Sequence, residues 1–271
     1  MKAIIAISDT HVGSTVGLCP KHGLSVPDGG WYQPNKFQET LMRYYDDFWG
    51  KFVPRMIKGA KKVVIVLNGD LIDGDHHQTI NIATPSTDKQ REGAIEIFEP
   101  LKKFGSIFVT KGTEAHSGPG SEAEEAIAKR LGCAQNEVGE YSQWQHWIDL
   151  DNVIFQFAHH IGVTSSAAYE SSAPMREMVA GLVEAAQWGR GLPDVFVRSH
   201  RHRFIPLSIP SIRGRIHSVI TPGWQLRTPF VERIDRMRMP HIGGVVFLVE
   251  NNRCLIEEKI YPLPEPKPTK I

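Results

Sequence analysis

The sequence is poor in cysteine and has no long hydrophobic run. Its 271 residues include only three cysteines, Cys19, Cys133 and Cys254. An odd number of widely spaced cysteines argues against a disulfide framework and favours a reducing compartment. No apolar stretch approaches the ~20 residues that a membrane-spanning helix needs. Lys2 precedes only five apolar residues before Ser8, too few for a secretory signal. We therefore expect a cytoplasmic protein with no membrane partner.

The chain also lacks a strong excess of either charge. It carries 31 Lys and Arg against 30 Asp and Glu, a formal net charge of +1. Proteins that grip long stretches of nucleic acid usually show a pronounced positive footprint. The balance therefore argues mildly against long duplex contacts, although it leaves room for a local basic patch. With 41% hydrophobic and 23% charged residues, the composition is that of an ordinary globular protein.

The first half of the chain alternates between strand and helix patterns. Apolar, β-branched-rich runs predict strands over residues 2–8, 62–68 and 105–110. Helical spacing of apolar side chains predicts helices over residues 36–58, 88–103 and 121–131. Because the strand runs barely alternate, we expect strands that are buried on both faces. Pro54 should end or kink the first helix, since proline lacks the N–H that a helix interior requires.

The third of these helices carries many charged side chains. Ser121, with Glu124 three residues later, has the spacing of a capping box at a helix start. The charges further along suit i,i+4 pairing on a solvated face. They are Glu122, Glu124, Glu125, Lys129 and Arg130.

The second half is richer in strands, and it settles the expected architecture. Strand patterns cover residues 141–150, 152–158, 194–198, 204–208, 215–220, 243–249 and 253–260, with one helix over 174–189. We predict an α/β fold, a layered β-sandwich of mixed sheets flanked by helices. We expect a single domain over residues 1–260 with loop insertions near 13–35 and 71–90. A Pro/Lys-rich tail follows at 261–271.

Four apolar runs each end in residues that can bind metal. These endings are Asp9-Thr10-His11, Gly69-Asp70, His159-His160 and His200-Arg201-His202. Strand ends in an open sheet can converge on one crevice, where ligands usually bind. Asp oxygens together with His nitrogens suit Mn, Fe or Zn better than Ca. A carboxylate such as Asp70 could bridge two ions ~3.5–4 Å apart, a spacing that clamps a phosphate and activates a water.

These motifs, in this order, resemble the calcineurin-like metallophosphoesterase superfamily. That family carries DxH, GDxxD, GNH(E/D), H and GHxH. The corresponding elements here are Asp9-x-His11, Gly69-Asp70-x-x-Asp73, a strand-end histidine and His200-x-His202. The resemblance covers residues 9–202. It implies a β-sandwich flanked by helices, two divalent transition-metal ions, for which we favour Mn over Fe or Zn, and a phosphoester substrate.

The resemblance also implies a set of metal ligands, carried across motif by motif. Four residues would hold the first ion: Asp9, His11, Asp70 and His202. Asp70 would also bridge to a second ion, completed by His200 and a strand-end histidine. We favour His159 for that position because it comes first after its strand. Its neighbour His160 would then support a ligand or touch the substrate.

Other polar residues near the motifs have supporting roles in this interpretation. Asp73 would orient ligands through hydrogen bonds rather than bind an ion itself. Arg198, Arg201 and Arg203 flank the histidine pair, and a guanidinium there could pair with a substrate phosphate or be solvated. We place Arg201 among the residues that support ligands or contact substrate.

One motif departs from the family pattern. Where the family has Gly-Asn-His-Glu/Asp, this chain has Gly112-Thr113-Glu114-Ala115-His116. Thr113 replaces the ligating Asn, so Glu114 could take the ligand role, since a carboxylate binds a hard divalent ion better than a hydroxyl does. The displaced His116 could protonate the leaving group as general acid. Ser199 replaces the first Gly of GHxH. Residues 69–77, 111–116 and 221–224 resemble a branch found in phages and prophages.

The sequence therefore predicts a two-metal hydrolase of phosphoesters, with phosphodiesters favoured and a metal-activated water as nucleophile. One alternative is a Mn-dependent nuclease that cuts DNA or RNA, so the substrate could be a nucleotide or a nucleic acid. Another is a non-catalytic scaffold that keeps the fold but has lost ligands, which the altered motif at Gly112–His116 makes conceivable. The sequence does not determine the oligomeric state.

Overall fold

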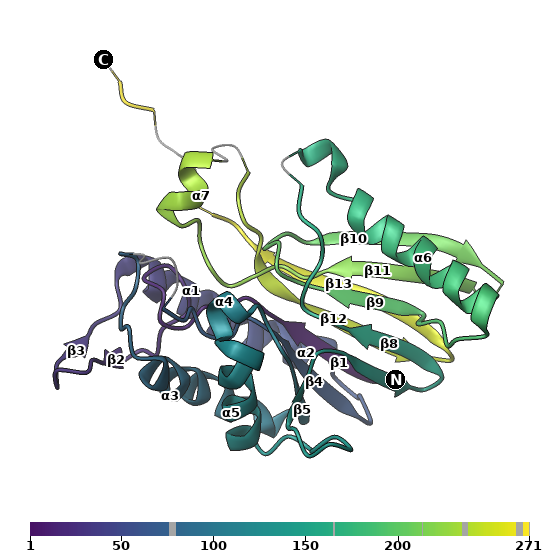
Figure 1. Ribbon diagram of the computed structural model, residues 1–271, viewed down its shortest axis with the longest axis horizontal. Helices are drawn as coiled ribbons and strands as arrows, with labels where there is room; N and C mark the ends of the chain where they lie inside the picture. The colour runs from purple at the N-terminus through teal and green to yellow at the C-terminus, as the bar shows by residue number, and fades with distance from the viewer. Residues whose placement is uncertain (76–79, 165, 213, 235–237, 264–267, 271) are drawn as a thin grey trace.

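The molecule is built from four layers, which Figure 1 shows in one view: helices, a first sheet, a second sheet and a further helix. The computed structural model describes residues 1–271 except 76–79, 165, 213, 235–237, 264–267 and 271. Part of the predicted tail at 261–271 lies outside the described residues. The predicted layered α/β sandwich of mixed sheets with flanking helices is confirmed by this arrangement.

The first sheet has six strands. In spatial order they are β13 (Arg253–Tyr261), β12 (Ile242–Glu250), β1 (Lys2–Ile7), β4 (Val63–Asn68), β5 (Ser106–Thr110) and β6 (Ser142–Gln143). Strands β1, β4, β5 and β6 are parallel to one another, whereas β12 runs antiparallel to both of its neighbours. The carboxyl ends of β1, β4 and β5 therefore meet at one edge of the sheet.

The second sheet has five strands. In spatial order they are β10 (Ile205–Ser211), β11 (Gly214–Ile220), β9 (Val195–Arg198), β8 (Val153–Phe157) and β7 (His146–Leu150). The three central strands are parallel and the two edge strands are antiparallel to them. A small hairpin of β2 (Leu24–Ser25) and β3 (Trp31–Tyr32) lies in the predicted insertion at 13–35.

Strand β1 shows why the strand runs lack polar alternation. Its side chains point alternately to the two faces of the sheet. Ile5 and Ile7 pack in the core beneath the helices, whereas Ile4 and Ala6 pack in the core between the sheets. All four are completely buried. A strand that is covered on both faces needs an apolar side chain at every position, as predicted.

Helices cover the outer face of each sheet (Figure 1). On the first sheet lie α1 (Lys36–Asp47), α2 (Val53–Met56), α3 (Thr87–Phe98) and α5 (Glu122–Leu131), with the short α4 (Glu114–Ser117) before α5. On the second sheet α6 (Ser172–Trp188) packs Met178 against Phe196 and Ile216. The remaining helix is α7 (Pro229–Ile234). Among the described residues, no helix combines the length and apolarity needed to cross a membrane.

Pro54 alters the first helix as expected from its missing N–H. A π-helical turn, η1 (Phe48–Phe52), separates α1 from α2. The Val53 N–H accordingly bonds back to the Phe48 carbonyl, five residues earlier. The wider turn continues the chain past proline instead of ending the helix there. Similarly, a 3₁₀ segment, η2 (Glu99–Lys103), extends α3 to the predicted boundary.

The predicted capping box at Ser121 is wrong. Ser121 has a left-handed backbone (φ 56°) and makes no side-chain cap. Its hydroxyl donates instead to the Gly112 carbonyl at 3.1 Å. Glu124, expected on a solvated face, is fully buried and accepts a 3.3 Å bond from the Leu71 N–H. Both side chains serve contacts with the loops at the sheet edge, and these long-range contacts replace the local pattern.

Candidate metal centre

The loops that leave β1 and β4 run side by side past the ends of their strands. The Asp9 N–H donates to the Gly69 carbonyl at 3.0 Å, and the His11 N–H donates to the Asp70 carbonyl at 3.1 Å. From the second sheet, the His200 N–H donates to Asp9 Oδ2 at 3.3 Å. These bonds bring the ends of β1, β4 and β9 to one place, so the predicted convergence of strand ends is observed.

The residues at these strand ends share an uncommon backbone conformation. Five non-glycine residues of the centre have positive φ, between 42° and 71°: Asp9, His11, Asp70, His200 and His202. Residues other than glycine rarely adopt this backbone region. Each instance costs on the order of 1–3 kcal/mol and persists only where the surrounding structure holds it. The sharp turn that it creates directs consecutive loop side chains toward a common point rather than along the strand. Such strain is concentrated at functional sites in many proteins.

Three overlapping groups of ligand-type atoms lie in this region. Within each group, one nitrogen or carboxylate oxygen per residue lies within 4.8 Å of the others. The groups are Asp9, His11 and His202; His11, Asp70 and His116; and Asp70, His159 and His200. The structure thus brings together six of the seven predicted metal ligands, together with His116.

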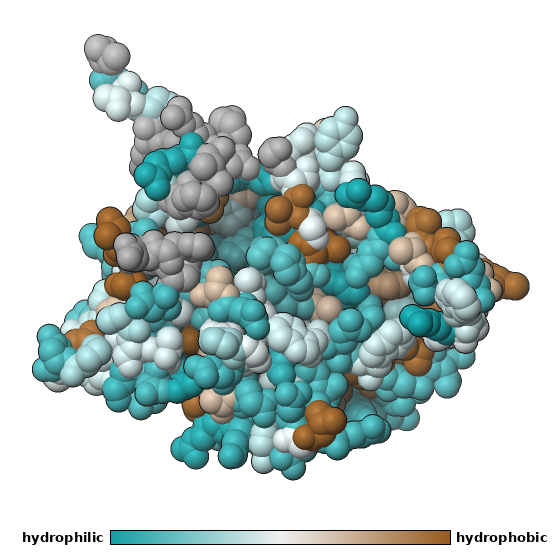
Figure 2. Space-filling view, viewed as in Figure 1, coloured by the Kyte–Doolittle hydropathy of each residue, from teal (hydrophilic) through white to brown (hydrophobic). Residues whose placement is uncertain are grey.

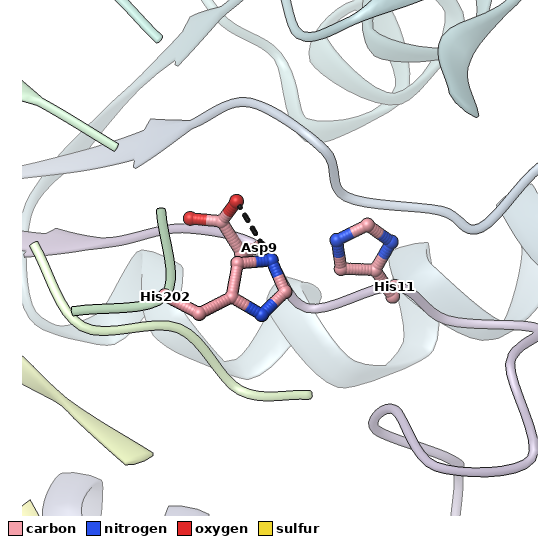
Figure 3. Close-up of side chains that lie close together, drawn as sticks. All are labelled: Asp9, His11 and His202. Carbon is pink, nitrogen blue, oxygen red and sulfur yellow. Dashed lines mark ion pairs between the residues drawn. The ribbon is translucent and has the colours of Figure 1, made fainter. Parts of the chain in front are cut away.

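The first group joins the two sheets. Asp9 and His11 come from the loop after β1, and His202 comes from the loop after β9 (Figure 3). The Oδ1 atom of Asp9 lies 3.3 Å from Nε2 of His202. The ring centroids of His11 and His202 are 5.1 Å apart. One carboxylate and two imidazoles therefore face one another across the end of the sandwich.

The third group is centred on Asp70. Its Oδ2 atom lies 2.9 Å from His159 Nε2 and 3.9 Å from His200 Nδ1. Both carboxylate oxygens also accept bonds from Thr113, Oδ1 from the backbone N–H at 2.6 Å and Oδ2 from the hydroxyl at 3.0 Å. Because Asp70 also belongs to the group of His11, it is the carboxylate shared between the two sides of the centre.

Hydrogen bonds fix the orientation of two histidines. His159 Nδ1 lies 2.7 Å from the Asn68 carbonyl, which can only accept, so Nδ1 carries the proton. His11 Nδ1 lies 3.1 Å from Asp73 Oδ1, and an ionised carboxylate requires the same tautomer. In each ring Nε2 is left as the atom available to the centre. A histidine that donates its second N–H to a carbonyl or carboxylate is the usual arrangement around a bound metal.

Three ligand-type atoms of the centre are shielded from solvent: Asp9 Oδ1, His11 Nε2 and His159 Nε2. Among the described residues, His11 Nε2 makes no hydrogen bond, whereas Asp9 Oδ1 lies 3.3 Å from His202 Nε2 and His159 Nε2 lies 2.9 Å from Asp70 Oδ2. Leaving a buried polar atom such as His11 Nε2 unsatisfied costs about 1–3 kcal/mol. Carboxylate oxygens and imidazole nitrogens gathered in one buried cluster fit divalent transition-metal ions.

The charges of the centre stabilise one another strongly. Burial acts to raise the pKa of Asp9, but His202 and His159 outweigh it and bring that pKa to about 2. Burial likewise opposes the ionisation of Asp70, whose pKa is nevertheless held well below its ordinary value by His159 and His200. For His159, burial is outweighed by Asp70 and Asp9, and its pKa rises to about 10. Without a metal, protons on the histidines balance the buried carboxylates.

A chain of buried polar groups connects the two sheets beneath the centre. Asn68 Nδ2 donates to Ser199 Oγ at 2.6 Å, and Ser199 Oγ lies 2.7 Å from Thr221 Oγ1. Thr221 contacts the Ser8 hydroxyl at 2.8 Å, and Ser8 donates to Asp9 Oδ2 at 2.5 Å. All five residues are fully buried. The Ser199 that replaces a family glycine is therefore a member of a network that ends on Asp9.

The altered motif at Gly112–His116 is arranged differently from the prediction. Glu114 does not reach the centre: it is exposed, and its carboxylate accepts a 3.0 Å bond from the Gly120 N–H. Thr113 contacts Asp70 instead, and its hydroxyl lies 3.4 Å from His200 Nδ1. Gly112 packs so closely that a Cβ would lie 2.4 Å from the Asp70 nitrogen.

His116 lies at the edge of the centre. Its ring stands edge-on to that of His11, with centroids 4.5 Å apart, and its Nδ1 bonds to the Asp73 carbonyl at 2.8 Å. Burial and the nearby His11 lower its pKa to about 4. A general acid must carry a proton at the working pH. The general-acid role predicted for His116 is therefore poorly matched by this environment.

The other predicted supporting residues surround the centre. Asp73 is buried and orients His11, as described above. His160 is exposed, and its ring lies 4.4 Å from that of His200. Arg201 is partly buried, and its Nη1 donates to the Glu170 carbonyl at 2.7 Å.

Two supporting residues were missed by the sequence analysis. Gln225 Nε2 donates to Asp73 Oδ1 and to Ser14 Oγ, both at 3.2 Å. Glu124 is buried beside Asp70, and this burial raises its pKa to about 7. Neither residue belongs to a motif, because each acts through a partner that is distant in the sequence. For Gln225 the only available signal was a polar residue between Trp224 and Leu226, and Glu124 gave no signal because it lies among other charged residues.

Comparison with known proteins gives only distant structural likeness. No family model matches the chain, and no curated protein matches its sequence. A predicted phosphoesterase from Streptococcus pneumoniae is 10% identical, with 96% of this chain and 93% of that chain covered and a TM-score of 0.38. An archaeal phosphodiesterase is 12% identical, with 96% of this chain and 99% of that chain covered and a TM-score of 0.41. A metallophosphoesterase from Sphaerobacter thermophilus is 10% identical, with 96% of this chain and 89% of that chain covered and a TM-score of 0.38.

Proposed function

We propose that this chain is a metal-dependent phosphoesterase that hydrolyses phosphodiesters at a centre of two divalent transition-metal ions, with Mn favoured over Fe or Zn. The observation that carries the proposal is the set of three overlapping ligand groups, of which the first and second share His11 and the second and third share Asp70. The ordered motifs that resemble calcineurin-like metallophosphoesterases support the same conclusion.

The ligand roles follow from these groups. Asp9, His11 and His202 would hold one ion, and His159 and His200 the other. Asp70, which is grouped with His159 and His200 and also with His11, would be shared between the two ions. When bound, two such ions supply an activated water and neutralise the charge of a phosphate during in-line displacement. The protein holds the carboxylates ionised and presents Nε2 of His11 and His159 toward the ions.

Two neighbouring side chains would have supporting roles, His116 toward the substrate and Thr113 toward Asp70. His116 is neutral near pH 7 because of its lowered pKa, so it would accept a hydrogen bond from a water or a substrate hydroxyl. Thr113 would fix the position of Asp70 through its two hydrogen bonds. Glu114, exposed and bonded to Gly120, has no part in this proposal.

The non-catalytic alternative is disfavoured by the energetic cost of the centre. A scaffold without metal would gain nothing from five carboxylate and histidine residues that are clustered together and each have a strained, positive-φ backbone. We therefore favour an enzyme, whose place in the cell remains a prediction from the sequence.

The proposal is tested by metal content and hydrolysis measured on the same preparation. Elemental analysis of the full chain, loaded with Mn, Zn or Fe and dialysed, should give about two ions per chain. The loaded protein should hydrolyse bis-p-nitrophenyl phosphate faster than p-nitrophenyl phosphate, and a chelator should abolish both activities. Full hydrolysis in chelator, or no bound metal and no hydrolysis with any of the three ions, would refute it.

A further inference from the structure

Three arginines gather beside the loop that carries His200 and His202. Arg201 lies between the two histidines in sequence, and Arg203 follows directly. Arg203 Nε and Arg238 Nε approach Glu170 Oε1 at 3.3 and 3.5 Å. Arg201 Nη1 donates to the backbone carbonyl of Glu170 rather than to its carboxylate. The side chains of Arg203, Arg238 and Glu170 retain between 12% and 21% of their exposure.

The guanidinium of Arg201 has a donor that the described residues leave unsatisfied. Among the described residues, no carboxylate lies within ion-pairing distance of Arg201, and its Nη2 atom is shielded from solvent and makes no hydrogen bond. Burial lowers the pKa of Arg201, the nearby Glu170 carboxylate acts to raise it, and the positive charges of Arg238 and Arg203 act to lower it. A guanidinium with an unused N–H beside two like charges is a strong position for an anion, because an anion would satisfy the donor and offset the repulsion.

The position of this arginine relative to the proposed metal ligands is set by the backbone. His200 and His202 both have left-handed conformations, with φ of 71° and 50°. Arg201 is the residue between these two histidines, and its guanidinium reaches the Glu170 carbonyl at 2.7 Å. The contacts of Arg203 and Arg238 with Glu170 also join the start of α6 to the segment after α7. Figure 2 shows the surface hollowed beside the start of α6.

From this arrangement we propose that Arg201, supported by Arg203, forms a subsite for a second phosphate of the substrate, next to the phosphoester that is hydrolysed. The inference rests on the proposed function and narrows its substrate class to phosphodiesters that carry a neighbouring phosphate. An anion of this size can accept two parallel bonds from a guanidinium fork, which a lysine cannot supply. Arg203 and Arg238 add positive charge beside the subsite while both remain paired with Glu170.

The substrate pair that tests this subsite differs only in the second phosphate. Thymidine 5′-(p-nitrophenyl phosphate) and its 3′-phosphorylated form release the same chromophore. With the metal-loaded full chain, we expect the 3′-phosphate to raise kcat/KM about tenfold or more, since a bond to a charged group contributes ~1.5–3 kcal/mol. A p-nitrophenyl diester of a propanediol that bears a second phosphate tells whether the preference requires a nucleoside or the phosphate alone.

The arginine variants then assign the preference. In Arg201→Gln the ratio of kcat/KM between the two thymidine substrates should fall to within about twofold of unity, and Arg201→Lys should restore part of it. Arg215→Gln is the matched control, because Arg215 is exposed at the β10–β11 hairpin and bonds only to Ser208 among the contacts of the described residues. Because each ratio is taken within one variant, a general loss of activity does not change it. Melting temperatures verify that the variants fold.

Three outcomes would overturn the inference, and they are distinguishable. If both thymidine substrates are hydrolysed and the ratio is the same in the wild type and in Arg201→Gln, the subsite is wrong while the phosphoesterase stands. If neither substrate is hydrolysed with any metal, the proposed function fails and the subsite fails with it. A preference that is lost equally in Arg215→Gln also contradicts the assignment, because it reflects overall charge.

Discussion

The two sheets contribute to the candidate centre in different ways. The first sheet supplies the carboxylates, and Asp9 and Asp70 are 0% and 1% exposed. Asp70 is held by two bonds from Thr113. The second sheet supplies three histidines, of which the side chains of His200 and His202 are 24% and 21% exposed. The first sheet thus fixes the negative charge deep in the fold, and the second forms the side that faces solvent. Losses on the first side should be the more severe.

The largest effect is expected for Asp70→Asn. The amide keeps the size of the side chain but removes the charge of the one carboxylate that is grouped with His11 and also with His159 and His200. We expect kcat/KM for bis-p-nitrophenyl phosphate to fall at least about 1,000-fold, which corresponds to ~4 kcal/mol of lost transition-state stabilisation. Metal content after dialysis should fall below one ion per chain. Asp75→Asn, at an exposed loop position nearby, is the control, and retention of activity in Asp70→Asn would contradict the shared role.

A smaller effect is expected on the histidine side. His200 belongs to one ligand group only, so His200→Ala should lose one ion and keep the other. Elemental analysis should change from about two ions per chain to about one, and kcat should fall while the remaining ion stays bound. His22→Ala, which removes an exposed histidine paired with Glu96, should leave the metal content unchanged. If His200→Ala released both ions, the two sheets would not hold separable sites.

Gln225 offers a finer test of the first side. Its amide donates to Asp73, which in turn holds His11. We expect Gln225→Ala to weaken metal affinity or activity about 10-fold, the lower end of the range for residues that orient a ligand. Gln225→Glu should be worse than alanine, since a carboxylate beside Asp73 cannot donate. Gln187→Ala on the exposed face of α6 is the control. Equal metal titration curves for Gln225→Ala and the wild type would contradict the role of Gln225 in supporting His11 through Asp73.

The contrast between local pattern and contacts with other segments explains how much of the fold and of the site could be predicted from the sequence. Each apolar run ends in its own ligands, so the strands, the layered fold and the residues Asp9, His11, Asp70, His200 and His202 follow from local pattern. Glu114 was misplaced because its position depends on the bond to Gly120, which holds the side chain away from the centre. Glu124 looked like a helix-surface charge, yet the loop after β4 covers it. Neither the local bond from Gly120 nor the long-range bond from Leu71 leaves a period or spacing in the sequence.

The smallest expected effect is a difference between the two sides in how the stability of the metal-free protein depends on pH. The pKa of Asp9 is lowered to about 2, so its contribution to stability is present above about 3.8 and is lost as the pH falls through 2. The pKa of His159 is raised to about 10, so its contribution is complete below about 6.5 and is lost as the pH rises through 10. The carboxylate side therefore governs acid sensitivity, and the histidine side governs alkaline sensitivity.

We therefore expect the melting temperature of the chelated protein to fall steadily between pH 6.5 and 10. A bound metal replaces the proton as the positive partner of Asp70, so the Mn-loaded protein should show a shallower fall over the same range. Differential scanning calorimetry of both forms, with His217→Ala as a control for a half-buried histidine on β11 outside the centre, measures the difference. Parallel curves for the two forms would mean that proton and metal do not compete for His159, and the pairing of the acidic and basic sides would have to be reconsidered.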